Sequence, residues 1–363
     1  MASVGKLAHL DNRRRMRLIR RCAWLILMLS CAARAAGDEP ADESPWLLVP
    51  TMSSDPKLGT SVGAMGGYLF RIDPESRQSM ALTSISYSDS DSYVGGVFGQ
   101  LYFDANRQKL LVGVARGKIN NDYDDFLGSG IPAQTTDQLN AEFLRYYRGI
   151  TDNWYLGAQA VSSNYVIGAD DLLGEILDRI GLTGFDSVGA GLVAEYDSRD
   201  KIRNPGDGDY LVIHNIAYSK SLGGDVSFDT YRIDYSRYRE IVESHLLAWQ
   251  LSGKWTDDAP IGGYASISLR GYVRGNYLAP NYTHVQAEDR ISLGSRWGMA
   301  VFAGIACLYD GLSDCEQSEN LFASAGAGVI YTLKPEAGIV IRSEIAKGES
   351  SDYVFYLRMG HPF

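Results

Sequence analysis

The sequence predicts an all-β fold, a transmembrane antiparallel β-barrel of about sixteen strands. The first observation behind this prediction is a repeated pattern of short segments in which apolar and polar residues alternate, separated by turns rich in Asp, Asn, Gly and Pro. The pattern is clear where Tyr231, Ile233 and Tyr235 alternate with Arg232 and Asp234. Such a strand turns its apolar face to lipid and its charged face to a lumen. The 23 tyrosines fit the aromatic girdles of a barrel of this kind.

The second observation is the last segment, which carries apolar side chains at every second position and ends on an aromatic residue. We interpret these residues as a C-terminal barrel signal: Tyr353, Phe355, Leu357, Met359 and Phe363. The pattern is typical of a closing strand with one lipid-facing side. We therefore expect the barrel assembly machinery to be a partner during biogenesis. We expect outer-membrane lipids and lipopolysaccharide to surround the folded protein.

The third observation is an export signal at the amino end. Six arginines precede an apolar run from Cys22 to Ala33, and small residues that suit cleavage follow. The apolar run is roughly a dozen residues, whereas a membrane-spanning helix needs about 20. We expect a secretory signal peptide at 1–36, a short periplasmic linker at 37–45 and the barrel at 46–363. The expected location is the outer membrane of a Gram-negative bacterium.

Alternation and turn residues place the barrel strands in order along the chain. We expect strands near 46–54, 59–72, 78–88, 92–105, 109–118, 138–150, 153–166, 188–199, 208–221, 226–240, 245–256, 285–296, 298–309, 321–333, 337–347 and 352–363. A soluble β-sandwich would alternate in the same way. The export signal, the terminal aromatic residue and the number of strands favour the barrel over the sandwich.

The connections between these strands fall into a short set and a long set. The short turns should face the periplasm, and they include 73–76, 106–108, 151–153 and 334–337. The long connections should lie outside the cell, near 119–137, 167–187, 257–284 and 310–320.

Charge and cysteine content narrow the function further. Without residues 1–35 the chain has 26 Lys and Arg against 43 Asp and Glu, which argues against nucleic acid as a partner. Cys307 and Cys315 lie eight residues apart, and this spacing suits a loop-closing disulfide better than a metal site. Paired acids such as Asp124 and Asp125 lie in expected loops without a nearby histidine. We therefore expect no enzyme activity, no metal and no cofactor.

Two segments go beyond a generic barrel pattern. The first is an expected periplasmic turn, whose distinctive residues are Asp197, Arg199, Asp200, Pro205 and Gly208. Its charged side chains can pair locally while proline and glycine turn the chain, so that the turn fixes strand register. The second is Arg270-Gly271-Tyr272, within the longest expected loop. Glycine there allows a sharp bend, and the tyrosine can pack against the wall.

These two motifs resemble those of the BamA/TamA superfamily, also called bacterial surface antigen barrels. The resemblance continues through 285–290, 301–304, 326–328 and 341–346, and it covers most of 190–363. It implies that the long loop folds inward as a lumen loop and that Arg270 meets an acidic residue on the inner wall. The family's usual aspartate is replaced here by Gly304, two residues after Phe302.

Another acid must therefore serve as the partner of the loop arginine. Glu288 and Glu344 are both candidates, because alternation puts each on the same strand face as a neighbouring arginine. A buried arginine is costly unless it is paired with an acid. The alternative is that Arg270 is a solvated loop charge.

The resemblance also implies a function, with one part missing. Assembly and secretion members carry periplasmic POTRA domains ahead of the barrel, whereas about nine residues separate the expected cleavage site from the first strand here. We expect a POTRA-less barrel that assists assembly, insertion or export of a protein or lipid client at the outer membrane. A passive or gated pore is the first alternative, and a structural or surface-binding barrel is the second.

Overall fold

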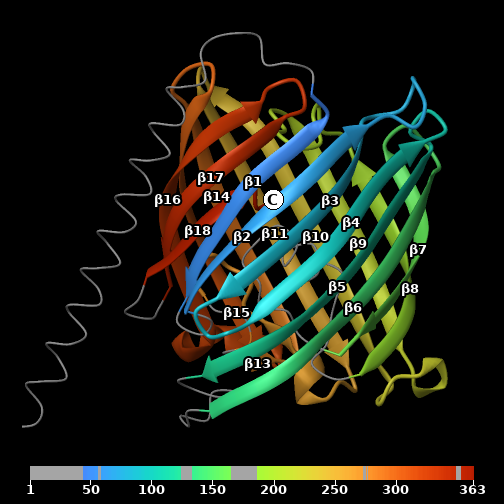
Figure 1. Ribbon diagram of the computed structural model, residues 1–363. Helices are drawn as coiled ribbons and strands as arrows, with labels where there is room; N and C mark the ends of the chain where they lie inside the picture. Colours follow the sequence, from blue (N-terminus) through green and yellow to red (C-terminus); the bar gives the residue numbers. More distant parts are fainter. Residues whose placement is uncertain are drawn as a thin grey trace, which may run out of the picture. The chain divides into compact units, whose positions relative to one another are not determined.

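The strands between Trp46 and Met359 form a sheet that closes on itself as an antiparallel barrel (Figure 1). The structure is a computed structural model that describes residues 44–55, 59–123, 133–164, 186–272, 275, 277–348 and 353–363. Sixteen strands follow one another around the described part of the barrel, so the predicted fold class is confirmed. The expected signal peptide and most of the expected linker lie outside the described residues. No described helix is both long and apolar enough to cross a membrane.

Chain order and spatial order agree around the barrel, with one exception between β11 and β14. The barrel strands are β1 (Trp46–Asp55), β2 (Gly59–Phe70), β3 (Ser79–Ser88), β4 (Tyr93–Phe103), β5 (Gln108–Tyr123), β6 (Ala133–Gly149), β7 (Trp154–Ser163), β8 (Ser187–Asp197), β9 (Gly208–Tyr218), β10 (Phe228–Val242), β11 (His245–Asp257), β14 (Asn281–Ser292), β15 (Trp297–Tyr309), β16 (Leu321–Lys334), β17 (Ile339–Lys347) and β18 (Tyr353–Met359). The two-residue strands β12 (Ala265–Ser266) and β13 (Leu278–Ala279) pair with each other within the long loop. Short 3₁₀ helices lie in connections: η2 (Lys220–Leu222), η3 (Ile261–Gly263), η4 (Leu312–Glu316) and η5 (Ser318–Asn320).

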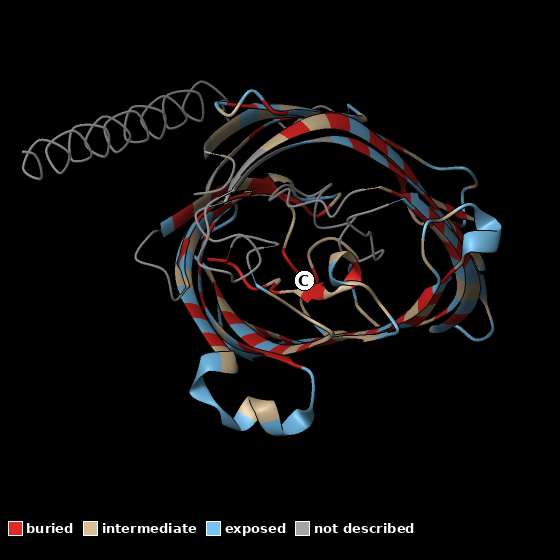
Figure 2. Ribbon diagram, turned by 90° about the horizontal axis from the view of Figure 1, so that it is seen from below, coloured by how far each residue is buried: buried red, intermediate tan, exposed pale blue. Residues whose placement is uncertain are grey.

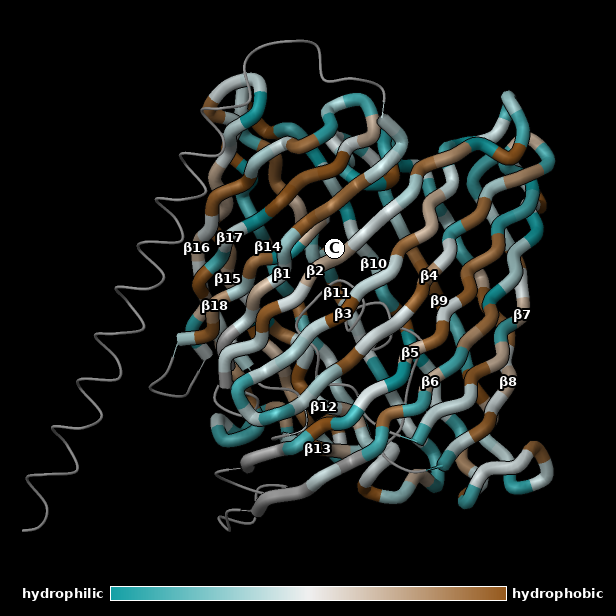
Figure 3. Tube along the Cα trace, viewed as in Figure 1, coloured by the Kyte–Doolittle hydropathy of each residue, from teal (hydrophilic) through white to brown (hydrophobic). Residues whose placement is uncertain are grey.

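Each strand turns alternate residues inward and outward, as the sequence pattern predicts. Strand β10 pairs with β9 on one side and β11 on the other. Its Arg232 and Asp234 are buried inside the barrel, whereas its Tyr231 is 47% exposed on the outside. In β8, Val193 is buried and its neighbour Leu192 is 71% exposed. Hydrophobic and hydrophilic positions therefore alternate along the strands in Figure 3. An outer surface of exposed aliphatic and aromatic side chains around a partly charged interior is the architecture of outer-membrane barrels.

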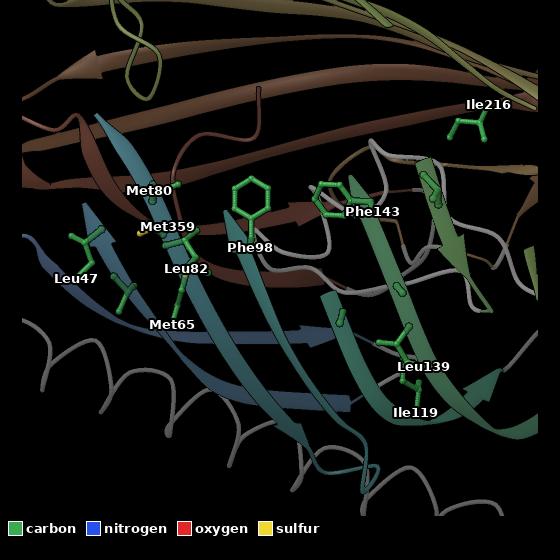
Figure 4. Close-up of a cluster of buried hydrophobic side chains, with 14 of the residues drawn as sticks. Leu47, Met65, Met80, Leu82, Phe98, Ile119, Leu139, Phe143, Ile216 and Met359 are labelled. Carbon is green, nitrogen blue, oxygen red and sulfur yellow. The ribbon is translucent and has the colours of Figure 1, made fainter. Parts of the chain in front are cut away.

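The inner wall is mostly apolar on one side, where Lys109 and Arg145 are its buried charged residues among those described, and it is more highly charged on the other. Buried side chains of β1 to β6, among them Leu47, Phe98 and Phe143, form the largest hydrophobic cluster (Figure 4). The inner faces of β10, β14 and β17 instead carry arginine, aspartate and glutamate. The charged side is therefore where an inward-folded loop finds polar partners.

Several strand boundaries differ from the prediction. The strand expected at 285–296 is Asn281–Ser292, and β5 and β6 extend to Tyr123 and from Ala133, beyond the expected 109–118 and 138–150. The ends of β5 and β6 are set by the pairing between the two strands. They pair along sixteen positions, including residues that do not alternate between apolar and polar.

The final strand is the largest correction. It was expected over 352–363 with all its apolar residues outside, but β18 ends at Met359 because Gly360 takes a φ of +86° and turns the chain inward. Met359 is 3% exposed and packs within the inner cluster that contains Ile339. Phe363 is 6% exposed inside the barrel against Tyr238. We call residues 360–363 the inward tail.

The inward tail shortens the seam at which the barrel closes. Strands β1 and β18 pair at three described positions, Met52↔Leu357, Ser53↔Tyr356 and Ser54↔Phe355. The other barrel neighbours pair at between seven positions, as for β17 and β18, and sixteen, as for β5 and β6. The segment of β1 from Leu47 to Thr51 therefore has no β18 partner in the described ladder.

Candidate functional site: a loop latched inside the barrel

The long connection between β11 and β14 enters the lumen. After η3 and β12, the residues Ile267, Leu269 and Tyr272 are at most 6% exposed, although none of them belongs to a barrel strand. They pack with Tyr282, Leu308 and Phe322 on the wall. Figure 2, a view along the barrel, shows buried chain within the ring of strands. The loop that the resemblance placed in the lumen therefore lies against the inner wall.

Gly271 allows the loop backbone to touch the wall. Its φ of +96° suits glycine, and a Cβ atom at this position would lie 2.8 Å from the backbone nitrogen of Gly348. The N–H of Gly271 donates to the hydroxyl of Tyr356 on β18, at 2.9 Å. The hydroxyl of Tyr272 donates to the carbonyl of Ala323 on β16, at 2.7 Å. The loop thus bridges two strands of the wall that β17 separates.

Arg270 contacts both acids that the alternation pattern selected. Its Nη1 donates to Glu288 Oε2 at 2.7 Å and to Glu344 Oε1 at 3.0 Å. The guanidinium lies 3.4 Å from the centroid of the Phe302 ring, a cation–π contact. Arg270 is 6% exposed, so it is not a solvated loop charge.

Gly304, where the resemblance predicts an aspartate, has no room for a side chain. A Cβ atom on Gly304 would lie 2.9 Å from the Cβ of Gln286 and 3.0 Å from Cδ2 of the loop residue Leu269. The loop therefore occupies the space in which a side chain at this position would lie. The acids that contact Arg270 come instead from β14 and β17.

Glu288 and Glu344 belong to a larger ion-pair network, which we call the latch network. Glu288 also accepts from Arg290 Nε at 2.7 Å and from Arg342 Nη1 and Nη2 at 2.8 and 2.9 Å. Glu344 lies 2.5 Å from Arg342 Nη2 and 3.4 Å from Arg358 Nε. All of these side chains are at most 8% exposed. Ions buried to this extent are tolerated only when they are paired and hydrogen-bonded.

Sequence reasoning missed part of this network. Arg358 and the hydroxyl of Tyr356 point inward from β18, opposite to the outward Leu357 and Phe355. The same alternation could have identified these two residues. The residues between the outward apolar residues of this strand must face the lumen.

The inward tail connects the latch network to the turn between β8 and β9. Arg342 Nη1 donates to His361 Nδ1 at 2.6 Å, and His361 Nε2 donates to Asn204 Oδ1 at 2.9 Å. Arg290 Nη2 donates to the backbone oxygen of Phe363 at 2.9 Å. This arrangement requires a neutral imidazole. Burial and the nearby charges of Arg290 and Arg342 lower the pKa of His361 well below its usual value.

The turn of residues 198–207 is held by its own charges. Asp197 accepts from Arg199 Nε and Nη2 at 2.8 and 3.0 Å, and Asp200 Oδ1 accepts the N–H of Gly206 at 2.8 Å. Gly208 has a φ of +110°, and a Cβ there would lie 2.5 Å from the carbonyl oxygen of Ser198. Local pairing of the expected kind is therefore present.

The same turn also reaches beyond its own strands. Arg203 Nη2 donates to the carbonyl of Gln78 in the β2–β3 connection, at 2.9 Å. Asn204 accepts a hydrogen bond from His361 of the inward tail. The turn therefore contacts both the β2–β3 connection and the inward tail. Pro205 lines a cavity behind it.

Cys307 and Cys315 form a disulfide, with their Cα atoms 5.8 Å apart. The bond ties β15 to η4 in the following connection. Within the part of the chain that the structure describes, no group of three or more potential ligand side chains is placed to hold a metal ion.

Comparisons with known proteins support the barrel fold. No protein-family model and no curated protein matches the sequence. BamA from Haemophilus ducreyi lacking POTRA domains 1–3 is similar in structure with a TM-score of 0.53 at 13% identity, covering 86% of this chain and 70% of that one. CdiB from Acinetobacter baumannii gives 0.57 at 11%, covering 87% and 59%. CdiB from Escherichia coli gives 0.57 at 12%, covering 89% and 66%. The chain thus spans less than two thirds of either CdiB chain, and the likeness is one of fold.

Proposed function

We propose that this outer-membrane barrel assists the assembly, insertion or export of a protein or lipid client, and that the client engages the open edge of β1. The observation that carries the proposal is the seam, where β1 and β18 pair at three described positions. Short turns, the start of β1 and the inward tail all lie at one end of the barrel, which in this proposal faces the periplasm.

The open edge has the chemistry that recruits a strand. Residues 47–51 of β1 pair with β2 on one side, from Leu47↔Gly67 to Thr51↔Gly63, but have no partner in the described β18 ladder on the other. Unpaired backbone groups at a sheet edge are a template for an incoming strand. In this edge Leu48 is 77% exposed on the outside and Val49 is buried inside, so an added strand would continue both barrel faces.

The latch supports this role because it holds β18 without needing β1. Tyr356 binds the loop, Arg358 lies beside Glu344, and β17 pairs along seven positions. The seam can then open while β18 stays in place. The BamA and CdiB barrels share the fold.

A disulfide across the seam tests the proposal. Met52→Cys with Leu357→Cys joins directly paired outward positions, at a separation that suits a disulfide. The matched control, Thr83→Cys with Val97→Cys, joins β3 to β4, which the proposal leaves closed. We expect the oxidised seam variant to deplete a specific set of surface proteins or lipids, and reductant to restore them. An unchanged surface inventory with a fully formed seam disulfide contradicts the proposal.

A gated pore is the second candidate, favoured by the charged inner faces of β10, β14 and β17. Uptake of small polar dyes, measured in the same strains, separates the two. Dye entry that changes with the seam or latch variants, while the surface inventory stays intact, favours the pore. If neither the surface inventory nor dye uptake changes, a structural or surface-binding barrel is favoured.

A further inference from the structure

A cavity of about 230 Å³ lies inside the barrel, away from the Arg270 loop. The turn of residues 198–207 and the inward tail close it at the end of the short turns. Its walls come from β3 to β6 and from β9 and β10. One part of the lining is apolar and consists of Met80, Phe98, Leu111 and Val212. Neither the edge of β1 nor the acids of the latch network line the cavity.

Arg145 on β6 lines the cavity and is incompletely paired. It is 5% exposed, its Nε donates to Gln159 Oε1 at 2.7 Å, and its Nη1 lies 3.4 Å from the hydroxyl of Tyr147. Its Nη2 is buried without a hydrogen-bond partner. Within the described residues, Arg145 forms no ion pair with a carboxylate. A buried guanidinium that is not paired with a carboxylate is energetically unfavourable. An anionic ligand would supply the missing negative charge.

The other charged groups of the lining differ from Arg145. Arg199 is satisfied by Asp197, and Asp234 is paired with Arg232. Arg203 binds only the side-chain and backbone oxygens of Gln78, and its Nε is also buried without a partner. The cavity therefore offers two arginines that lack a described acid.

We propose that this cavity binds a small monocarboxylate with an apolar body. The unpaired Nη2 of the Arg145 guanidinium is available to donate a charge-assisted hydrogen bond to a carboxylate oxygen. The aliphatic and aromatic wall takes the body of the ligand. The volume is below the roughly 300–1,000 Å³ of pockets for drug-sized molecules, so the ligand is small. Asp234 in the lining disfavours a second negative charge.

This site is distinct from the edge of β1 that the proposed function uses, and it adds a ligand-controlled contact to the inward tail. Gly360, His361 and Phe363 line the cavity, so a bound ligand also contacts the inward tail. Binding would then stabilise the folded barrel, and the stabilisation would grow with the logarithm of the ligand concentration once the site is mostly occupied.

The test uses the full chain folded in detergent, with benzoate as the probe and benzamide as its uncharged analogue of the same shape. Isothermal titration and the temperature of barrel unfolding are the two measurements. We expect benzoate to bind and to raise the unfolding temperature, and benzamide to do neither at equal concentration. Equal responses to the two probes, or no response to benzoate at millimolar concentration, overturn the proposal.

Three variants locate the binding. Arg145→Gln removes the charge and should weaken benzoate binding about tenfold or more, the loss expected for one charge-assisted hydrogen bond. Val212→Phe fills the apolar wall and should also weaken it while leaving the arginine. Arg116→Gln removes an outward arginine paired with Glu142 and should bind like the parent. All variants must first show the heat-modifiable gel shift of a folded barrel. Unchanged affinity in Arg145→Gln, or equal loss in Arg116→Gln, overturns the proposal.

Discussion

The two edges of β18 are held in different ways. Toward β17 the ladder runs from Ile341↔Met359 to Lys347↔Tyr353, seven paired positions, whereas toward β1 it has three. The inner face of β18 adds the Tyr356 bond to the loop and the Arg358 contact with Glu344. A strand can thus be fixed from one edge and from inside while its other edge stays largely free. The latched side and the seam side of β18 should therefore respond differently to mutation.

The largest effect is expected from the centre of the latched side. Glu288→Ala leaves Arg270, Arg290 and Arg342 without the carboxylate that they share, and should lower the free energy of unfolding by about 3–5 kcal/mol. The loss of the heat-modifiable gel shift at a lower temperature measures it. The matched control is Asp289→Ala, next in sequence, whose side chain is 33% exposed and pairs with His245. Equal shifts in both variants argue against a special role for the latch network.

A smaller effect is expected when the loop alone is released. Arg270→Ala leaves each glutamate paired with another arginine, so the loss should be about 1.5–3 kcal/mol, the range for hydrogen bonds to charged groups. The loop should also become more sensitive to protease. Arg237→Ala, which removes a half-exposed arginine, serves as the control. An unchanged gel shift together with unchanged protease sensitivity contradicts the latch.

The next variant is designed to lengthen the pairing between β18 and β1 at the seam. Gly360→Val disfavours the positive φ by about 1–2 kcal/mol and favours an extended chain that continues β18 along β1. We expect amide hydrogen exchange in residues 47–51 to slow. Gly311→Val is the control, because Gly311 has a φ of −115° that valine accepts. Exchange that stays as fast as in the parent rejects the link between the inward tail and the short seam.

The smallest effect is a pH dependence from the inward tail. His361 has a lowered pKa in the folded state and about 6.5 when unfolded, so the unfolded chain takes up the proton first as pH falls. The barrel should lose stability as pH falls below about 6.5 toward the lowered pKa, with a slope of at most about 1.4 kcal/mol per pH unit. His361→Gln should flatten this slope, while His245→Gln at the exposed pair with Asp289 should change it less. Unfolding temperatures between pH 7 and pH 5 measure the difference.

Period-two alternation made much of the barrel predictable, because it fixes the face of every strand residue whatever the exact boundaries. It therefore put Glu288 and Glu344 on the inner wall, where both contact Arg270. Strand ends were less predictable, since pairing extends β5 and β6 into residues without alternation.

The course of the last four residues was not predictable from the pattern. The sequence continues to look like a strand, and only the backbone freedom of Gly360 marks the turn inward. The contacts that stabilise this turn come from Arg290 on β14 and Arg342 on β17, and not from β18 itself. The Arg145 cavity was missed for the same reason, because its lining is assembled from eight strands, two connections and the inward tail.

The burial of Phe363 distinguishes the folded barrel from the unfolded chain. In an unfolded chain this aromatic side chain is accessible to other proteins. In the finished barrel it is 6% exposed and Arg290 holds its backbone oxygen. A chaperone that recognises this residue would therefore retain unfinished chains and release completed ones, since folding itself removes the mark by which they are bound.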